Sequence, residues 1–281
     1  MQNAATAARP SAQPPAQPDW ALAVKVPVVI TLYFWLIKIM ATTVGETAAD
    51  YLAVDLHLGL VATSVVMTVL FVAVLTAQMR ARRYVPWLYW LTVTLISVVG
   101  TLVTDNLTDQ LGVPLPVSTA LFAAALMATF MFWWFSERSL SIHSIGTPRR
   151  EAFYWAAILF TFALGTAGGD LAAERLQLGY AMSAVLFGGA IALTAAAYYL
   201  FKVSAVTTFW VAYILTRPLG ATLGDWLSKP GAEGGLGLGT MGTSALFLLA
   251  ILSLVIYLTA TRRDQLQEGQ QGDRQEESSL A

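Results

Sequence analysis

The chain contains no cysteine among its 281 residues, and only 12% of its residues are charged. The absence of cysteine excludes disulfides, thiolate metal sites and iron–sulfur clusters. The two histidines, His57 and His143, fall in predicted loops, which argues against haem held between helices. A net charge of −1 gives no sign of nucleic-acid binding. Since a soluble domain carries about twice this fraction of charge, the composition indicates another class of protein.

Long uncharged runs identify that class. They span residues 61–77, 117–135 and 181–201. A helix needs about 18–20 apolar residues to cross a hydrocarbon core about 30 Å thick. A buried helix of a soluble protein would show a polar face at a period of about 3.6 residues, and these runs do not. The sequence therefore predicts an all-α integral membrane protein whose main partner is the lipid bilayer.

A repeat of the form W-x9-G-x4-D occurs four times. Its members are Trp35, Gly45 and Asp50; Trp90, Gly100 and Asp105; Trp155, Gly165 and Asp170; and Trp210, Gly220 and Asp225. An aromatic residue precedes each tryptophan, and a Leu-Gly pair follows each aspartate, ending at Gly59, Gly112, Gly179 and Gly239. Self-similarity at a fixed period indicates a repeat architecture.

Each unit is predicted to hold two transmembrane helices. The eight predicted helices span residues 26–49, 59–79, 86–105, 117–136, 152–170, 180–201, 206–225 and 241–260, which group into repeats 26–79, 86–136, 152–201 and 206–260. Pro27 and Pro86 are expected in the first turn of their helices. The membrane domain is predicted over 21–261, between disordered tails at 1–20 and 262–281.

Basic residues gather on one side of the predicted spans. Arg80, Arg138, Arg149 and Lys202 are among ten on that side, whereas only Arg175 and Lys229 flank the other. The positive-inside rule then places both termini in the cytoplasm. Because each unit has an even number of spans, all four point the same way and can close around a pseudo-fourfold axis, with either the first or the second helices inside.

The tandem unit with its tryptophan resembles a bacterial family of multi-pass membrane proteins built from four two-helix repeats of unknown function. The resemblance covers about residues 26–262. It implies the eight-span fold and a location in the bacterial inner membrane, and it brings no established activity.

The repeat aspartates are the first candidate site residues. Asp50, Asp105, Asp170 and Asp225 fall near the outer ends of the odd-numbered helices. Each aspartate is expected either to act as N-cap of a following helical segment or to converge with the others on a cation, since acidic rings in membranes commonly mark ion paths. The repeat by itself favours neither interpretation.

Departures from the repeat give a sharper indication. Unit one adds Glu46, and Lys38 lies deep in its first span; unit four holds Arg217 where the other units have Thr42, Ser97 and Phe162. A lone cation at the bilayer centre costs roughly 3 kcal/mol or more. We therefore expect Lys38 and Arg217 to face the interior and pair with carboxylates, from their own helix or a neighbouring unit. A buried ion network that only fixes packing is the alternative.

The glycines of the repeat, Gly45, Gly100, Gly165 and Gly220, are expected to allow close helix packing. A helix break that frees carbonyls for ion coordination is the second interpretation, with Pro218 as its most favourable place. The hydroxyls of Thr42 and Thr43 are candidate oxygen ligands, although such hydroxyls usually bond their own backbone.

Together these features favour a transporter or exporter of a small cation. Carboxylate and hydroxyl oxygens favour H⁺, Na⁺, Mg²⁺ or Mn²⁺ over Zn²⁺ or Cu⁺. The candidate metal ligands are Glu46, Asp50, Asp105, Asp170 and Asp225. No cofactor is expected, no nucleotide-binding loop is present, and a homo-oligomer is possible. A non-transporting scaffold or sensor subunit and a transporter of a small organic anion are the alternatives. Enzymatic activity is not expected, because the glycine-x-glycine-aspartate string of intramembrane aspartyl proteases is absent.

Overall fold

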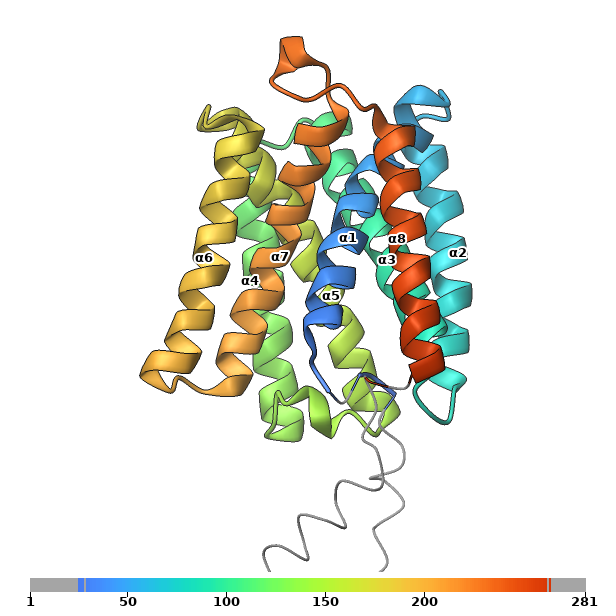
Figure 1. The fold of residues 1–281 in the computed structure, drawn as a ribbon, viewed down its shortest axis with the longest axis vertical. Helices are drawn as coiled ribbons and strands as arrows, with labels where there is room; N and C mark the ends of the chain where they lie inside the picture. Colours follow the sequence, from blue (N-terminus) through green and yellow to red (C-terminus); the bar gives the residue numbers. More distant parts are fainter. Residues whose placement is uncertain (1–24, 28, 262, 264–281) are drawn as a thin grey trace, which may run out of the picture.

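The computed structural model describes residues 25–27, 29–261 and 263, so the predicted tails lie almost wholly outside the described part. The described residues form eight long helices, joined by short helical turns and loops, and contain no strand. The helices are α1 (Leu32–Asp50), α2 (Leu60–Arg80), α3 (Pro86–Asp105), α4 (Leu115–Glu137), α5 (Pro148–Asp170), α6 (Gly179–Phe201), α7 (Ala205–Ser228) and α8 (Thr240–Thr261). They run roughly parallel to one long direction of the molecule (Figure 1).

The predicted helix boundaries are mostly close to those observed, and α1 departs furthest. It begins at Leu32 rather than near residue 26, so Pro27 precedes the helix instead of lying in its first turn. Tertiary contacts hold the preceding segment in place: the Lys25 ammonium lies 2.9 Å from the Glu151 carboxylate of α5, and Val26 is buried. Pro86 does occupy the first turn of α3, as expected.

The odd-numbered helices form the inside of the bundle. α1 packs against α3, α3 against α5, α5 against α7, and α7 against α1, which closes a ring. Each second helix lies outside and packs on the first helix of the following unit: α2 on α3, α4 on α5, α6 on α7, and α8 on α1. The structure thus decides which helices are inside, a question that the sequence left open.

Six helices are long and apolar enough to cross a membrane by length and composition, namely α2, α3, α4, α5, α6 and α8. The outer helices expose many large apolar side chains, including Val65 and Val69 on α2 and Phe132 on α4. Such a surface suits hydrocarbon rather than water. The two remaining long helices, α1 and α7, carry the buried cations Lys38 and Arg217.

Aromatic side chains join each unit to the next at the end of the ring where the odd-numbered helices begin. The aromatic residue before each repeat tryptophan contacts the tryptophan of the following unit. The ring centroids are 5.4 Å apart for Phe34 and Trp90, 5.8 Å for Tyr89 and Trp155, 6.1 Å for Tyr154 and Trp210, and 5.7 Å for Phe209 and Trp35, which returns to unit one. The aromatic pairs are therefore packing residues.

The repeat glycines form the next layer along the ring. A Cβ atom on Gly45 would lie 1.9 Å from Ser97 Oγ, and one on Gly165 would lie 2.3 Å from Arg217 Cγ. Gly100 meets Phe162 and Gly220 meets Thr42 in the same way. Each glycine therefore meets the residue that lies three positions before the repeat glycine of the next unit. These contacts confirm the close-packing interpretation.

The alternative of a helix break at these glycines is wrong. Helices α1, α3, α5 and α7 continue through their glycines, and α7 also continues through Pro218. The α-helix gives way to a π-helical turn only after the repeat aspartate, in units one, two and three. These turns are Tyr51–Asp55, Asn106–Gln110 and Leu171–Arg175. Unit four lacks this turn and extends α7 to Ser228.

The second repeat marker has a backbone explanation. Gly59, Gly112, Gly179 and Gly239 have φ between 67° and 75°, a left-handed conformation that glycine adopts at little cost. Gly59 and Gly239 lie immediately before α2 and α8, Gly179 is the first residue of α6, and Gly112 lies three residues before α4. At each of them the chain reverses direction between two helices. The Leu-Gly pair therefore marks the turn between the two helices of a unit.

Candidate functional site

Arg217 of α7 is fully buried and contacts residues of the other three inner helices. Its Nη2 donates to Glu46 Oε2 at 2.9 Å, to Thr166 Oγ1 at 2.6 Å and to Thr101 Oγ1. Glu46, Thr101 and Thr166 occupy equivalent positions, one residue after the glycine of units one, two and three. The guanidinium is therefore the shared partner of the other three units.

The expectation that Arg217 faces inward and pairs with a carboxylate is confirmed. The partner is Glu46 of unit one rather than Asp225 of the same helix. Arg217 Nη1 also donates to the Thr42 carbonyl at 3.2 Å. Separating Arg217 from Glu46 would leave a buried charge without its partner. Their ion pair therefore joins units one and four.

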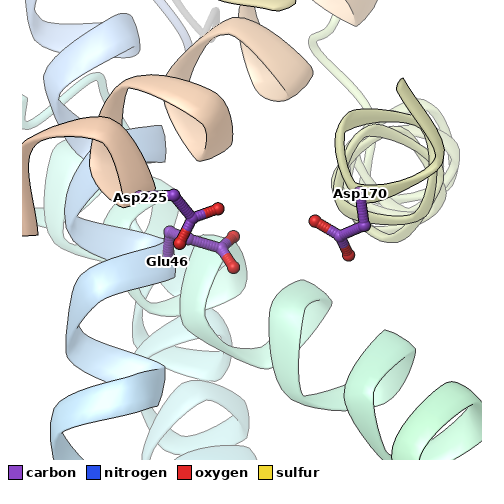
Figure 2. A group of neighbouring side chains, drawn as sticks. All are labelled: Glu46, Asp170 and Asp225. Atoms are coloured by element: carbon purple, nitrogen blue, oxygen red, sulfur yellow. The ribbon is translucent and has the colours of Figure 1, made fainter. Parts of the chain in front are cut away.

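Three carboxylates from three units converge just beyond Arg217. Glu46 of α1, Asp170 of α5 and Asp225 of α7 each offer an oxygen, and these oxygens lie within 4.8 Å of one another. Figure 2 shows Glu46 and Asp225 side by side, with the Asp170 carboxylate directed toward them from the opposite helix. This carboxylate cluster, Glu46, Asp170 and Asp225, contains three of the five candidate metal ligands.

Asp50 occupies a different environment. Lys229 Nζ donates to Asp50 Oδ2 at 2.9 Å and lies 3.8 Å from Asp225 Oδ1. Although partial burial opposes its charge, the Asp50 and Asp225 carboxylates raise the pKa of Lys229 above its usual value, so the residue stays an ammonium. Asp105, at the end of α3, is half-buried and has no hydrogen-bond or ion-pair partner within the described chain.

The interpretation of the aspartates as N-caps is not supported. Asp50, Asp105 and Asp170 do precede a helical segment each, but none of their side chains makes a capping hydrogen bond to it. Asp225 lies inside α7, three residues before the end of the helix. Because the segments continue the α-helix with helical backbone angles, they expose no new set of free N–H groups to cap.

Lys38 departs from the expectation of a carboxylate partner. It is fully buried, its Nζ donates to Thr216 Oγ1 at 3.2 Å, and the ammonium lies 4.3 Å and 4.1 Å from the ring centroids of Phe162 and Tyr213. No carboxylate among residues 25–27, 29–261 and 263 forms an ion pair with it. Aromatic faces attract a cation, and here they take the place of the counter-charge.

The candidate threonine hydroxyls are used by the helices themselves. Thr42 Oγ1 donates to the Ile39 carbonyl at 2.7 Å, and Thr43 Oγ1 donates to the same carbonyl at 3.1 Å. This is the usual role of threonine in a membrane helix. The hydroxyls that face the centre, Thr101 and Thr166, donate to the Ser97 and Phe162 carbonyls of their own helices and also accept from Arg217.

Sequence reasoning missed Lys229 as a site residue. It was assigned only to the sparsely charged flank, yet its side chain reaches two repeat aspartates. Its spacing of four residues from Asp225 on one helix was the available signal, because residues four apart share a helix face. Nothing in the sequence indicated that Lys229 lies beside Asp50 of unit one.

The comparisons with known proteins agree with the repeat. The family model described as "Repeat of Unknown Function (DUF347)" matches the chain four times, over residues 33–84, 88–139, 153–204 and 208–264. No curated protein and no solved structure matches the chain.

Proposed function

Because the chain belongs to the DUF347 repeat family, whose description names no activity, we propose a function from its own site: a membrane transporter of a small cation. The carrying observation is the convergence of three carboxylate oxygens, from Glu46, Asp170 and Asp225, within 4.8 Å. Oxygen ligands at such spacing suit a hard ion, which makes Mn²⁺ or Mg²⁺, or a cation exchanged for protons, the cargo we propose.

The charge balance supports this proposal. Five carboxylates, those of Glu46 and the four repeat aspartates, follow the repeat glycines and lie toward the C-terminal ends of the inner helices. Within the described chain only Arg217 and Lys229 form ion pairs with them. Ionised carboxylates in excess of cations are costly at low dielectric, so they call for protons or a bound cation.

We also propose the membrane topology that such a transporter needs. All eight long helices would span the bilayer, including α1 and α7, whose buried cations face the inside of the ring. The four units would surround a pseudo-fourfold axis, a view supported by the cyclic aromatic and glycine contacts. Both termini would be cytoplasmic in a bacterial inner membrane, following the excess of basic residues at that end.

The two ends of the ring differ in access. At the basic end, where the inner helices begin, buried aromatic side chains pack between successive units around the ring. They include Phe34, Tyr89, Tyr154 and Trp210. At the acidic end Asp50, Asp105 and Asp170 keep partial exposure. The partial exposure of these aspartates supports the proposal that a cation enters the cluster from the acidic end, which is the outer side in the proposed topology.

The alternatives draw less support from the geometry. An organic anion would need an accessible cation, but Arg217 is already paired with Glu46, and Lys38 is fully buried against the rings of Phe162 and Tyr213. A scaffold or sensor subunit would use the Arg217 network for packing alone, and it would require neither the three converging carboxylates nor their excess of charge. No cofactor and no enzymatic reaction are part of the proposal.

Purified protein in proteoliposomes tests the proposal. We expect uptake of Mn²⁺ or Mg²⁺ by the wild type, with a dependence on the proton gradient if protons are exchanged. Glu46→Gln and Asp225→Asn should each reduce the rate about 10-fold or more, while Asp109→Asn, an exposed carboxylate outside the cluster, should not. Absence of flux for every ion under every gradient would contradict the proposal and leave the scaffold alternative.

A further inference from the structure

Unit four supplies two cations that hold the carboxylates from opposite sides. Arg217 contacts Glu46 at the centre of the ring and is 0% exposed. Lys229 contacts Asp50 and Asp225 at the outer end, and its side chain is 31% exposed. The carboxylates between them are 21% exposed for Asp50 and 8% for Glu46 and Asp225. Exposure therefore falls stepwise from Lys229 to Arg217.

The backbone of Lys229 is fixed while its side chain is accessible. Its N–H donates to the Asp225 carbonyl at 2.8 Å, and its carbonyl accepts from Gly237 N–H at 2.9 Å. The returning loop packs so closely that a Cβ atom on Gly235 would lie 2.0 Å from the Lys229 carbonyl oxygen. Only rotation of the side chain is needed to move the ammonium away from Asp225.

We propose that Lys229 is the counter-charge of the empty transporter: its ammonium occupies the outer side of the carboxylate cluster when no cargo is bound and leaves when a cation enters. The inference rests on the proposed function and adds to it a role for one residue. It follows from the contact with Asp225, which belongs to the cluster, and from the exposure that lets Lys229 exchange with an ion arriving from the same side.

This arrangement has a mechanical consequence. A transporter that moves net cargo must return without that cargo. Where no proton takes its place, a carboxylate cluster without a cation resists closing because its charges would be buried unpaired. A tethered ammonium at high effective concentration supplies the missing charge during that step. Exchange of one bound cation for another does not include an empty step, so it does not need Lys229.

The test separates net transport from exchange. Proteoliposomes are loaded either without Mn²⁺ or with unlabelled Mn²⁺, and entry of radiolabelled Mn²⁺ is followed. For Lys229→Gln we expect net uptake to fall about 10-fold or more, exchange to stay within about 2-fold of the wild type, and the half-saturating Mn²⁺ concentration to fall. Lys229→Arg should keep net uptake, and Arg175→Gln, the exposed cation on the same side, should change neither mode.

Each other outcome overturns the inference. Unchanged net uptake in Lys229→Gln would show that the ammonium is not needed for the empty step, and equal loss of both modes would show that Lys229 only supports the fold. If the wild type moves no cation in either mode, the proposed function itself fails. Failure of the function and failure of this inference are therefore distinguishable.

Discussion

At the scale of single residues, the centre of the molecule depends on one guanidinium. Arg217 contacts side chains of three other units, and equivalent positions in those units carry the partners Glu46, Thr101 and Thr166. One arginine, present only in unit four, thus donates hydrogen bonds to the equivalent position of each of the other three units. An arginine suits this place because its planar fork presents several donors in fixed directions, which a lysine lacks.

Removal of this guanidinium should leave Glu46 charged and without its partner. We expect Arg217→Met to lower the free energy of unfolding by about 3–5 kcal/mol, the cost of breaking a buried ion pair on one side. The double variant Glu46→Met/Arg217→Met should be less destabilised than Arg217→Met alone, because no charge is left unpaired. Thermal and denaturant unfolding in detergent micelles measures both. A double variant no more stable than the single one would contradict the importance of the pair.

At the scale of helices, the close crossing of α5 and α7 depends on a glycine. A methyl group at Gly165 would overlap Arg217 and Pro218 Cδ, at 2.3 Å and 2.9 Å from the nearest atoms, whereas a methyl group at Gly168 meets nothing within 4 Å. The two positions lie on the same helix and form a matched pair.

We expect Gly165→Ala to destabilise the protein by about 1–3 kcal/mol, because α5 and α7 must move apart. Gly168→Ala should be neutral or stabilising by up to about 1 kcal/mol, because alanine favours a helix over glycine. Apparent melting temperatures of the two variants, measured side by side in the same detergent, provide the comparison. Equal effects of the two substitutions would argue against the close crossing.

At the scale of the whole molecule, the proposed orientation can be tested because the chain has no cysteine. A single cysteine placed at Ala232, in the short helix η6 (Gly231–Glu233) between α7 and α8, would report the acidic end, and one at Ser139, between α4 and α5, would report the basic end. We expect a membrane-impermeant maleimide to label only Ala232→Cys in intact cells and both variants after lysis. Labelling of Ser139→Cys alone in intact cells would reverse the orientation.

The sequence by itself determined the repeat, the number and approximate ends of the long helices, and the burial of Lys38 and Arg217. These follow from local properties: an apolar run of sufficient length forms a helix in lipid, a duplicated unit repeats its markers, and a cation within such a run must avoid hydrocarbon. The residues Trp35, Gly45 and Asp50 and their equivalents could therefore be found by counting.

Only the tertiary structure decided which residues meet. It placed the first helices inside, paired Arg217 with Glu46 of another unit, gave Lys38 aromatic rings in place of a carboxylate, and brought Lys229 to Asp50 across 179 positions. Four equivalent units can close around either set of helices, and the periodicity of a helix does not tell which neighbour faces it. Partner choice depends on how side-chain volumes fit where helices cross, and that fit is a property of the assembled ring.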